Sequence, residues 1–145
     1  LQKMFAPRGS SYVDLQSPAG IGIGAVVYNY DGTVYASDEG RMLAEMGDFT
    51  FRLGSLHDDY THLFGGETLL APLEDSLLEA APQCSDCPFL PYCGADPVFH
   101  RATQQDYLGH KAFSSFCTKQ MGILRHVITL LEDDPSASEI LRSWL

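Results

Sequence analysis

The sequence predicts an α+β fold in which a small β-hairpin packs with helices and a cysteine-rich loop. Three observations predict this class. Residues 21–36 hold an apolar, β-branched run that turns at an Asp-Gly pair and returns. Residues 67–81 and 114–131 carry apolar side chains at helical spacing. Between these two helices, residues 82–94 are interrupted by proline and glycine, which favours neither a helix nor a central strand.

The remaining elements follow from shorter patterns. We expect an entry segment over residues 1–20 that continues from an upstream domain, and a single domain over residues 21–145. Within that domain the patterns predict a helical turn at 39–47, a short strand at 49–53, a helix at 58–64 and a short last helix after Pro135.

The composition argues against two classes of partner. The chain has 19 acidic residues against 9 Lys and Arg and a net charge of −10. It holds no basic run, so we expect no nucleic-acid partner. No apolar stretch approaches the roughly 20 residues of a membrane-spanning helix, so we expect no membrane partner. We find no secretory leader and therefore expect a cytoplasmic location.

The four cysteines carry the strongest signal of a functional site. Cys84, Cys87 and Cys93 lie within ten residues of the loop, and Cys117 follows after 23 further residues. A loop interrupted by proline and glycine can bring three thiols toward one point, and a later element can supply a fourth. Four thiolates are the ligand set of structural zinc and of iron–sulfur clusters.

Four interpretations of these cysteines compete. Two disulfides require an oxidising compartment, for which the sequence offers no support. A redox Cys-x2-Cys pair opens a helix, whereas Pro88 directly follows Cys87 and more proline-rich loop comes after it. Structural zinc is a possible interpretation, although zinc ligands usually come as two closely spaced Cys pairs and this chain lacks the second pair. A cluster is larger and tolerates a triplet plus one distant ligand, so the spacing favours it modestly.

The last cysteine belongs to the best predicted helix. Cys117 falls in the first turn, with Ser114 or Ser115 as the N-cap. In isolation, a cysteine at this position is typical of a small buried hydrophobe. The triplet in the loop changes that interpretation, because three thiols require a fourth. The predicted apolar stripe contains Phe113, Cys117, Met121, Leu124, Val127 or Ile128, and Leu131.

The motif order adds a resemblance to a known family. In chain order the motifs are Asp31-Gly-Thr-Val-Tyr35, Leu53-Gly-Ser-Leu56, the thiol triplet ending in Pro91-Tyr-Cys-Gly94, and Cys117. This order resembles the SPASM domain, the cluster-binding C-terminal extension of many radical SAM peptide-modifying enzymes, over roughly residues 22–120. Through Tyr35–Met42 and Pro91–Gly94, the chain is similar to the maturase of the His-Xaa-Ser system.

The departures from the family pattern imply one cluster where most SPASM domains hold two. Ser37 and Pro97 stand where the first auxiliary cluster expects thiols. Cys84, Cys87, Cys93 and Cys117 match the ligands of the second auxiliary cluster one for one, which implies one fully ligated [4Fe–4S] cluster without an open iron. The candidates to offset its negative charge are the N-terminus of the Cys117 helix and the side chains of Lys119, Arg101, His100 and Lys111.

The resemblance also implies a function. The chain would be the auxiliary-cluster domain of a radical SAM enzyme that matures a ribosomally made peptide, serving electron transfer, the architecture of the peptide site, or both. SAM cleavage requires Cys-x3-Cys-x2-Cys, which these 145 residues lack. We therefore expect SAM and its core domain upstream in the same parent chain, and a precursor peptide as partner. The alternatives are a zinc-binding structural or interaction module and a free-standing iron–sulfur carrier.

Overall fold

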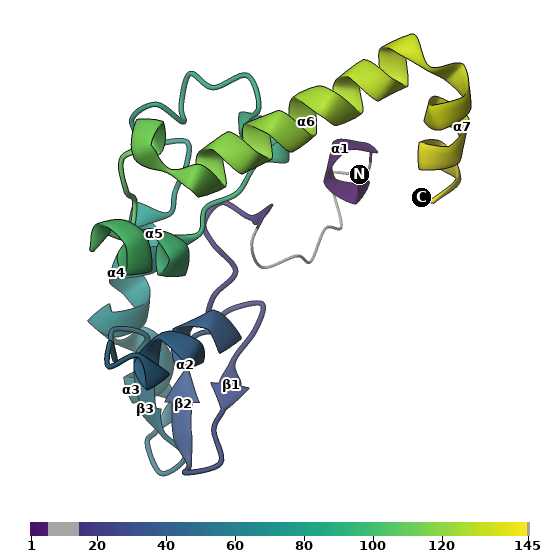
Figure 1. Cartoon of the computed structure of the whole chain (residues 1–145). Helices are drawn as coiled ribbons and strands as arrows, with labels where there is room; N and C mark the ends of the chain where they lie inside the picture. Colours follow the sequence, from purple (N-terminus) through teal and green to yellow (C-terminus); the bar gives the residue numbers. More distant parts are fainter. Residues whose placement is uncertain (6–14, 145) are drawn as a thin grey trace.

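Helices and one small sheet make up the fold (Figure 1), which confirms the α+β class. The structure is a computed structural model that describes residues 1–5 and 15–144. The apolar patch predicted at Tyr12-Val13 lies outside the described residues. In chain order the elements are α1 (Gln2–Phe5), β1 (Val27–Tyr28), β2 (Thr33–Tyr35), α2 (Asp38–Glu45), β3 (Arg52–Ser55), α3 (Tyr60–Gly65), α4 (Glu67–Asp75), η2 (Leu90–Tyr92), α5 (Pro97–Gln104), η3 (Lys111–Phe113), α6 (Ser115–Asp133) and α7 (Pro135–Ser143).

The predicted hairpin is present but shorter than residues 21–36. It pairs β1 with β2 in antiparallel register, and β3 joins the far side of β2. The Asp-Gly pair is not a two-residue turn, as the pattern had indicated. Asp31 Oδ1 accepts hydrogen bonds from the backbone N–H of Thr33 at 3.0 Å and from its hydroxyl at 2.6 Å, and the loop spans residues 29–32. A side-chain turn of this kind replaces the tighter backbone turn.

The third strand begins later than its pattern predicts. We expected residues 49–53 to be extended, whereas β3 covers Arg52–Ser55. Asp48 explains the shift, because its Oδ1 accepts from the backbone N–H of Thr50 at 3.0 Å and also from the Thr50 hydroxyl. The chain turns at residues 48–50 before it can pair.

The helix predicted at 67–81 ends early. α4 stops at Asp75, and the buried hydroxyl of Ser76 donates to the carbonyl of Leu73 at 2.9 Å. The same hydroxyl accepts a hydrogen bond from the backbone N–H of Ala19 at 2.9 Å. Residues 15–20, which the sequence placed in the entry segment, therefore pack against the end of α4. They also reach the cysteine loop, since the N–H of Ala95 donates to the carbonyl of Gln16.

The helix α5 was not predicted. α5 begins at Pro97, and Asp96 is its N-cap, accepting a hydrogen bond from the N–H of Phe99 at 2.8 Å. It ends at Gln105, whose φ of 60° lies in the left-handed region. Aspartate followed by proline is a helix-start signal that the sequence did contain.

The hydrophobic core joins the sheet to the cysteine loop. Val34 and Phe51 are fully buried at its centre, and α2 and α4 contribute Leu43 and Leu69. Half-buried residues of the cysteine loop pack against this core, namely Cys84, Leu90 and Cys93. The loop is thus part of the folded body, which fixes one side of the candidate site.

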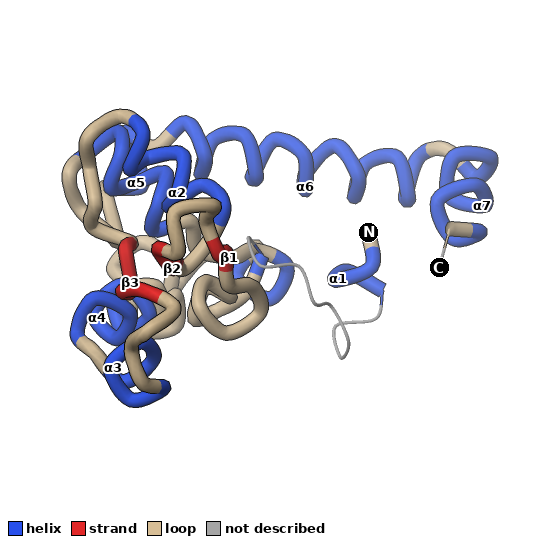
Figure 2. Tube along the Cα trace, turned by 90° about the horizontal axis from the view of Figure 1, so that it is seen from below, coloured by secondary structure: helices blue, strands red, loops and turns tan. Residues whose placement is uncertain are grey.

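The long helix α6 confirms the element predicted at 114–131 and extends from the body toward α7 (Figures 1 and 2). Its predicted stripe is wrong at one end. Phe113 precedes the helix and is 81% exposed, whereas Phe116 and Leu124 are the buried positions. Near α7, the guanidinium of Arg142 stacks over the ring of Phe5 in α1. Within residues 1–5 and 15–144, each helix is too short or too polar to span a bilayer.

Candidate four-thiol site

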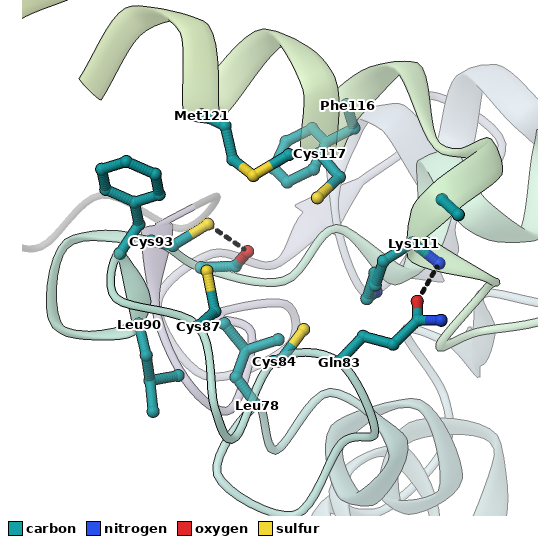
Figure 3. Close-up of a pocket in the computed structure, with 13 residues that line it drawn as sticks. Leu78, Gln83, Cys84, Cys87, Leu90, Cys93, Lys111, Phe116, Cys117 and Met121 are labelled. Carbon is teal, nitrogen blue, oxygen red and sulfur yellow. Dashed lines mark hydrogen bonds between the residues drawn. The ribbon is translucent and has the colours of Figure 1, made fainter. Parts of the chain in front are cut away.

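The cysteine loop is a succession of tight turns. The N–H of Cys84 donates to the carbonyl of Ala81 at 3.1 Å, and the N–H of Cys87 donates to that of Cys84 at 2.9 Å. The N–H of Cys93 donates to the carbonyl of Phe89 at 3.0 Å, across η2. Proline supports these turns because its fixed φ suits them and it has no N–H to satisfy. The chain therefore coils, and three thiols face one side of it (Figure 3).

The fourth thiol comes from the first turn of α6. Ser114 is the N-cap, and its Oγ accepts a hydrogen bond from the N–H of Cys117 at 3.2 Å. This cap fixes where the helix begins and therefore where Cys117 points. In Figure 3 its sulfur lies across the cavity from the thiols of the loop. The first-turn position suits a thiolate, because unpaired N–H groups and the helix dipole stabilise negative charge there.

A buried histidine supports the cap. His100 Nδ1 lies 2.7 Å from the carbonyl oxygen of Asp96, and Nε2 lies 2.8 Å from Ser114 Oγ. A carbonyl can only accept, so Nδ1 carries the proton and the Ser114 hydroxyl donates to Nε2. Burial lowers the pKa of His100, and the nearby Lys111 charge lowers it further, which keeps the ring neutral. The His100–Ser114 pair holds α6 against α5.

All four cysteines line one cavity of about 240 Å³. Its wall is otherwise mostly apolar, and Figure 3 shows the four sulfurs arranged around the space. The other lining residues are Leu78, Gln83, Phe89, Leu90, Gly94, Lys111, Ala112, Phe116 and Met121. The structure thus brings together every site residue that the sequence singled out.

The thiols are half-buried, and none is in a disulfide. Burial raises the pKa values of the Cys84, Cys93 and Cys117 thiols, because an apolar wall disfavours the charged form. Without a cation these three thiols are therefore protonated at neutral pH, and Cys93 Sγ lies 3.5 Å from the carbonyl of Gly94. Ionising all four requires positive charge in or beside the cavity.

Among the described residues that line the cavity, Lys111 is the only charged one. Its side chain is buried, with 9% of the residue exposed, and Nζ donates to the carbonyl of Leu108. Burial lowers the pKa of its ammonium group, while the facing cysteine sulfurs act to raise it. Lys111 is one of the four side chains predicted to offset a cluster's negative charge. It is also the one of these four that lines the cavity.

The other three candidate cations have different surroundings. Arg101 forms an ion pair with Asp48, with Nε 2.9 Å from the carboxylate. Lys119 is exposed, and its Nζ lies 5.6 Å from the ring centroid of Phe116. His100 is the neutral support described above. Lys3, which the sequence did not single out, donates through Nζ to the carbonyls of Leu15 and Cys93 and so approaches the loop from the outside.

Ser37 and Pro97 both have structural roles. Ser37 caps α2, where its Oγ accepts from the N–H of Gly40 at 3.0 Å, and Pro97 opens α5. Both residues are buried, and α2 packs against α5. The positions that the resemblance assigned to a first cluster are thus occupied by helix starts.

A single metal ion would need at least three ligand side chains around one point in the described parts of the chain. There, no group of three or more His, Cys, Asp or Glu side chains is arranged to hold one metal ion. The four thiols surround a volume rather than a point. Any group bound by all four must therefore fill that volume, or the loop and α6 must move together.

The fold and the site together define an α+β domain with a small antiparallel sheet and a four-cysteine cavity. Comparisons with models of known protein families, with curated proteins and with solved structures give no match.

Proposed function

We propose that this chain binds one [4Fe–4S] cluster through Cys84, Cys87, Cys93 and Cys117. The observation that carries the proposal is the shared cavity: three thiols from one loop and one from α6 line a single space of about 240 Å³. Four cysteine ligands are the usual set for such a cluster. The wall around the thiols, which includes Phe116 and Leu90, is mostly apolar.

The electrostatics of the cavity support a negatively charged occupant. A cluster with four thiolate ligands is anionic, and its surroundings must offset that charge. Lys111 supplies a buried positive charge on the wall. Cys117 itself lies in the first turn of the 19-residue helix α6, where the positive end of the helix dipole favours a negative charge.

Zinc is the competing occupant. A tetrahedral Zn²⁺ with Zn–S bonds of about 2.3 Å holds its four sulfurs about 3.8 Å from one another. Within the described residues, no three ligand-type side chains are arranged around such a point. A cluster places iron and sulfide between the thiolates, so its ligands stand farther apart. The size of the cavity therefore favours the cluster.

We further propose that the domain serves an enzyme that modifies a ribosomally made peptide, as the motif order suggests. When bound, a fully ligated cluster stores and passes single electrons. The four thiols leave no open position for a substrate, so the domain would carry electrons or form a wall of the peptide site. The SAM-cleaving core would lie in the same parent chain, and the precursor peptide would be its partner.

Anaerobic reconstitution tests the cluster. Protein incubated with iron and sulfide should bind about four irons per chain and become brown. Replacing Cys84 or Cys117 by Ala should remove most of this iron. The matched control is Met121→Leu, which alters a sulfur-bearing wall residue that is not a proposed ligand and should keep full iron. One zinc per chain with no sulfide, or a Cys117→Ala protein with full iron, would contradict the proposal.

The role in the parent enzyme needs a separate experiment. In the full-length protein, the double substitution Cys84→Ala and Cys93→Ala should leave uncoupled SAM cleavage measurable and abolish the peptide product. The reason is that SAM cleavage depends on the core alone, whereas product formation depends on this domain. Undiminished product from the double variant would show that the domain is dispensable for the reaction.

A further inference from the structure

Lys111 has a property that the proposed ligand set does not by itself explain. Lysine is seldom buried without an anionic partner, yet only 9% of Lys111 is exposed. In residues 1–5 and 15–144, no carboxylate lies within 4.0 Å of its Nζ. The group that accepts from Nζ is the neutral carbonyl of Leu108. The cavity that the side chain lines also holds the four thiols, which can supply an anionic partner when they bind a cofactor.

The surrounding structure holds Lys111 in place from two sides. Its backbone N–H donates to Gln83 Oε1 at 3.1 Å, which ties η3 to the loop immediately before Cys84 (Figure 3). Gln83 has a φ of 68°, in the left-handed region that non-glycine residues seldom adopt. The backbone at Gln83 thus adopts an unfavourable conformation while its side chain fixes the segment that carries Lys111.

The charges that face Lys111 come mainly from the thiols. The cysteines act on its pKa in the order Cys84, Cys117, Cys93, and the carboxylate of Asp106 contributes less than each of them. In return, the ammonium group lowers the pKa values of Cys84 and Cys117, against the larger effect of burial. The positive charge therefore acts on both sides of the cavity, on the loop and on α6.

We propose that Lys111 sets the reduction potential of the cofactor by placing a fixed positive charge on the cavity wall. This inference rests on the proposed cluster site and goes beyond it, because ligation alone does not require the lysine. Reduction adds one electron, taken from an external one-electron reductant such as dithionite, and no bond or proton need move. A nearby cation stabilises the added negative charge, and burial limits the screening of that interaction by salt.

The test compares three variants of the reconstituted protein by redox titration with EPR detection. Lys111→Met removes the charge and leaves an unbranched side chain one atom shorter, so reduction should become at least tenfold less favourable. For one electron, that is a shift of about 59 mV to more negative potential. Lys111→Arg keeps the charge and should stay within threefold of the wild type. Lys119→Met removes an exposed charge and is the matched control, also expected within threefold.

Each outcome separates the two proposals. A wild-type protein that binds no cluster refutes the proposed function. A loaded Lys111→Met protein with the wild-type potential, or a Lys119→Met shift as large as that of Lys111→Met, overturns the role of Lys111 alone. If Lys111→Met takes up no iron, Lys111→Arg decides. Full iron and the wild-type potential in Lys111→Arg support the charge, and failure to load in that variant also overturns the role.

Discussion

Removing the hydroxyl of Ser114 should destabilise the protein more than an ordinary cap deletion. Ser114 Oγ accepts the N–H of Cys117 at 3.2 Å and lies 2.8 Å from Nε2 of the buried His100. Ser114→Ala therefore removes an N-cap and also leaves a buried ring nitrogen without a partner. It perturbs the start of α6, where the fourth thiol is placed.

The magnitude follows from these two losses. Losing an N-cap hydroxyl costs about 1 kcal/mol of helix stability. Leaving a buried acceptor unsatisfied costs roughly 1–3 kcal/mol. We therefore expect Ser114→Ala to lower the free energy of unfolding by roughly 2–4 kcal/mol. Asp59→Ala is the comparison, because Asp59 caps α3 at the surface through His62 and should cost only about 1 kcal/mol.

Urea unfolding of the reduced, metal-free protein, followed by circular dichroism, measures both changes. The two variants should differ in their midpoints with similar slopes. Equal losses in Ser114→Ala and Asp59→Ala would refute the reasoning, because the His100 contact would then contribute nothing. On the reconstituted protein, Ser114→Ala should also hold iron more weakly, while Asp59→Ala should bind it like the wild type.

Three further predictions concern the framework around the site. Burial lowers the folded-state pKa of His100, so its stabilising contribution is present above the unfolded pKa of about 6.5 and is lost as pH falls. His100→Gln should therefore make the free energy of unfolding fall less steeply between about pH 7.5 and 5.5. A slope equal to that of the wild type would contradict this. A methyl group at Gly94 would overlap the backbone of Leu15, so Gly94→Ala should cost roughly 1–3 kcal/mol in urea unfolding and slow iron uptake; wild-type behaviour would show that the two segments are free to separate. Arg101→Ala breaks a partly exposed pair with Asp48 and should cost no more than about 1 kcal/mol, with the loss reduced at high salt; a loss several times larger would show that this pair is a buried anchor.

The parts of the fold that could be predicted depend on local signals. α6 was found because its apolar periodicity is long and Ser114 stands at the cap position. The hairpin was found but its turn was wrong, because the Asp31 side chain competes with the backbone for Thr33. α5 is harder to predict, because eight residues give a weak periodic pattern and the Asp96-Pro97 start signal is its strongest local cue.

Some features of the candidate site could be predicted from the sequence and others could not. The four cysteines could be named from the sequence, because a thiol triplet in a punctuated loop calls for a fourth ligand. Their shared cavity depends on how α6 crosses the loop, which is a long-range contact without a local signature. The burial of Lys111 is also a tertiary property, since it depends on Gln83 and on Leu108. The exposure of Phe113 is also a tertiary property, because η3 buries Lys111 and leaves Phe113 at the surface before α6 begins.

The division of the thiols between a loop and a helix has a mechanical consequence. A cofactor held by both Cys93 and Cys117 would act as a covalent cross-link between positions 24 residues apart in the chain. If the chain-entropy relation for disulfides is applied to this loop, closing it restricts the unfolded chain by about 3.5 kcal/mol. One thiol in the first turn of α6 would carry that entire linkage. Oxidative loss of the cofactor would therefore remove this cross-link and leave α6 held to the body by the packing of Phe116 and Leu124 and by the His100–Ser114 contact.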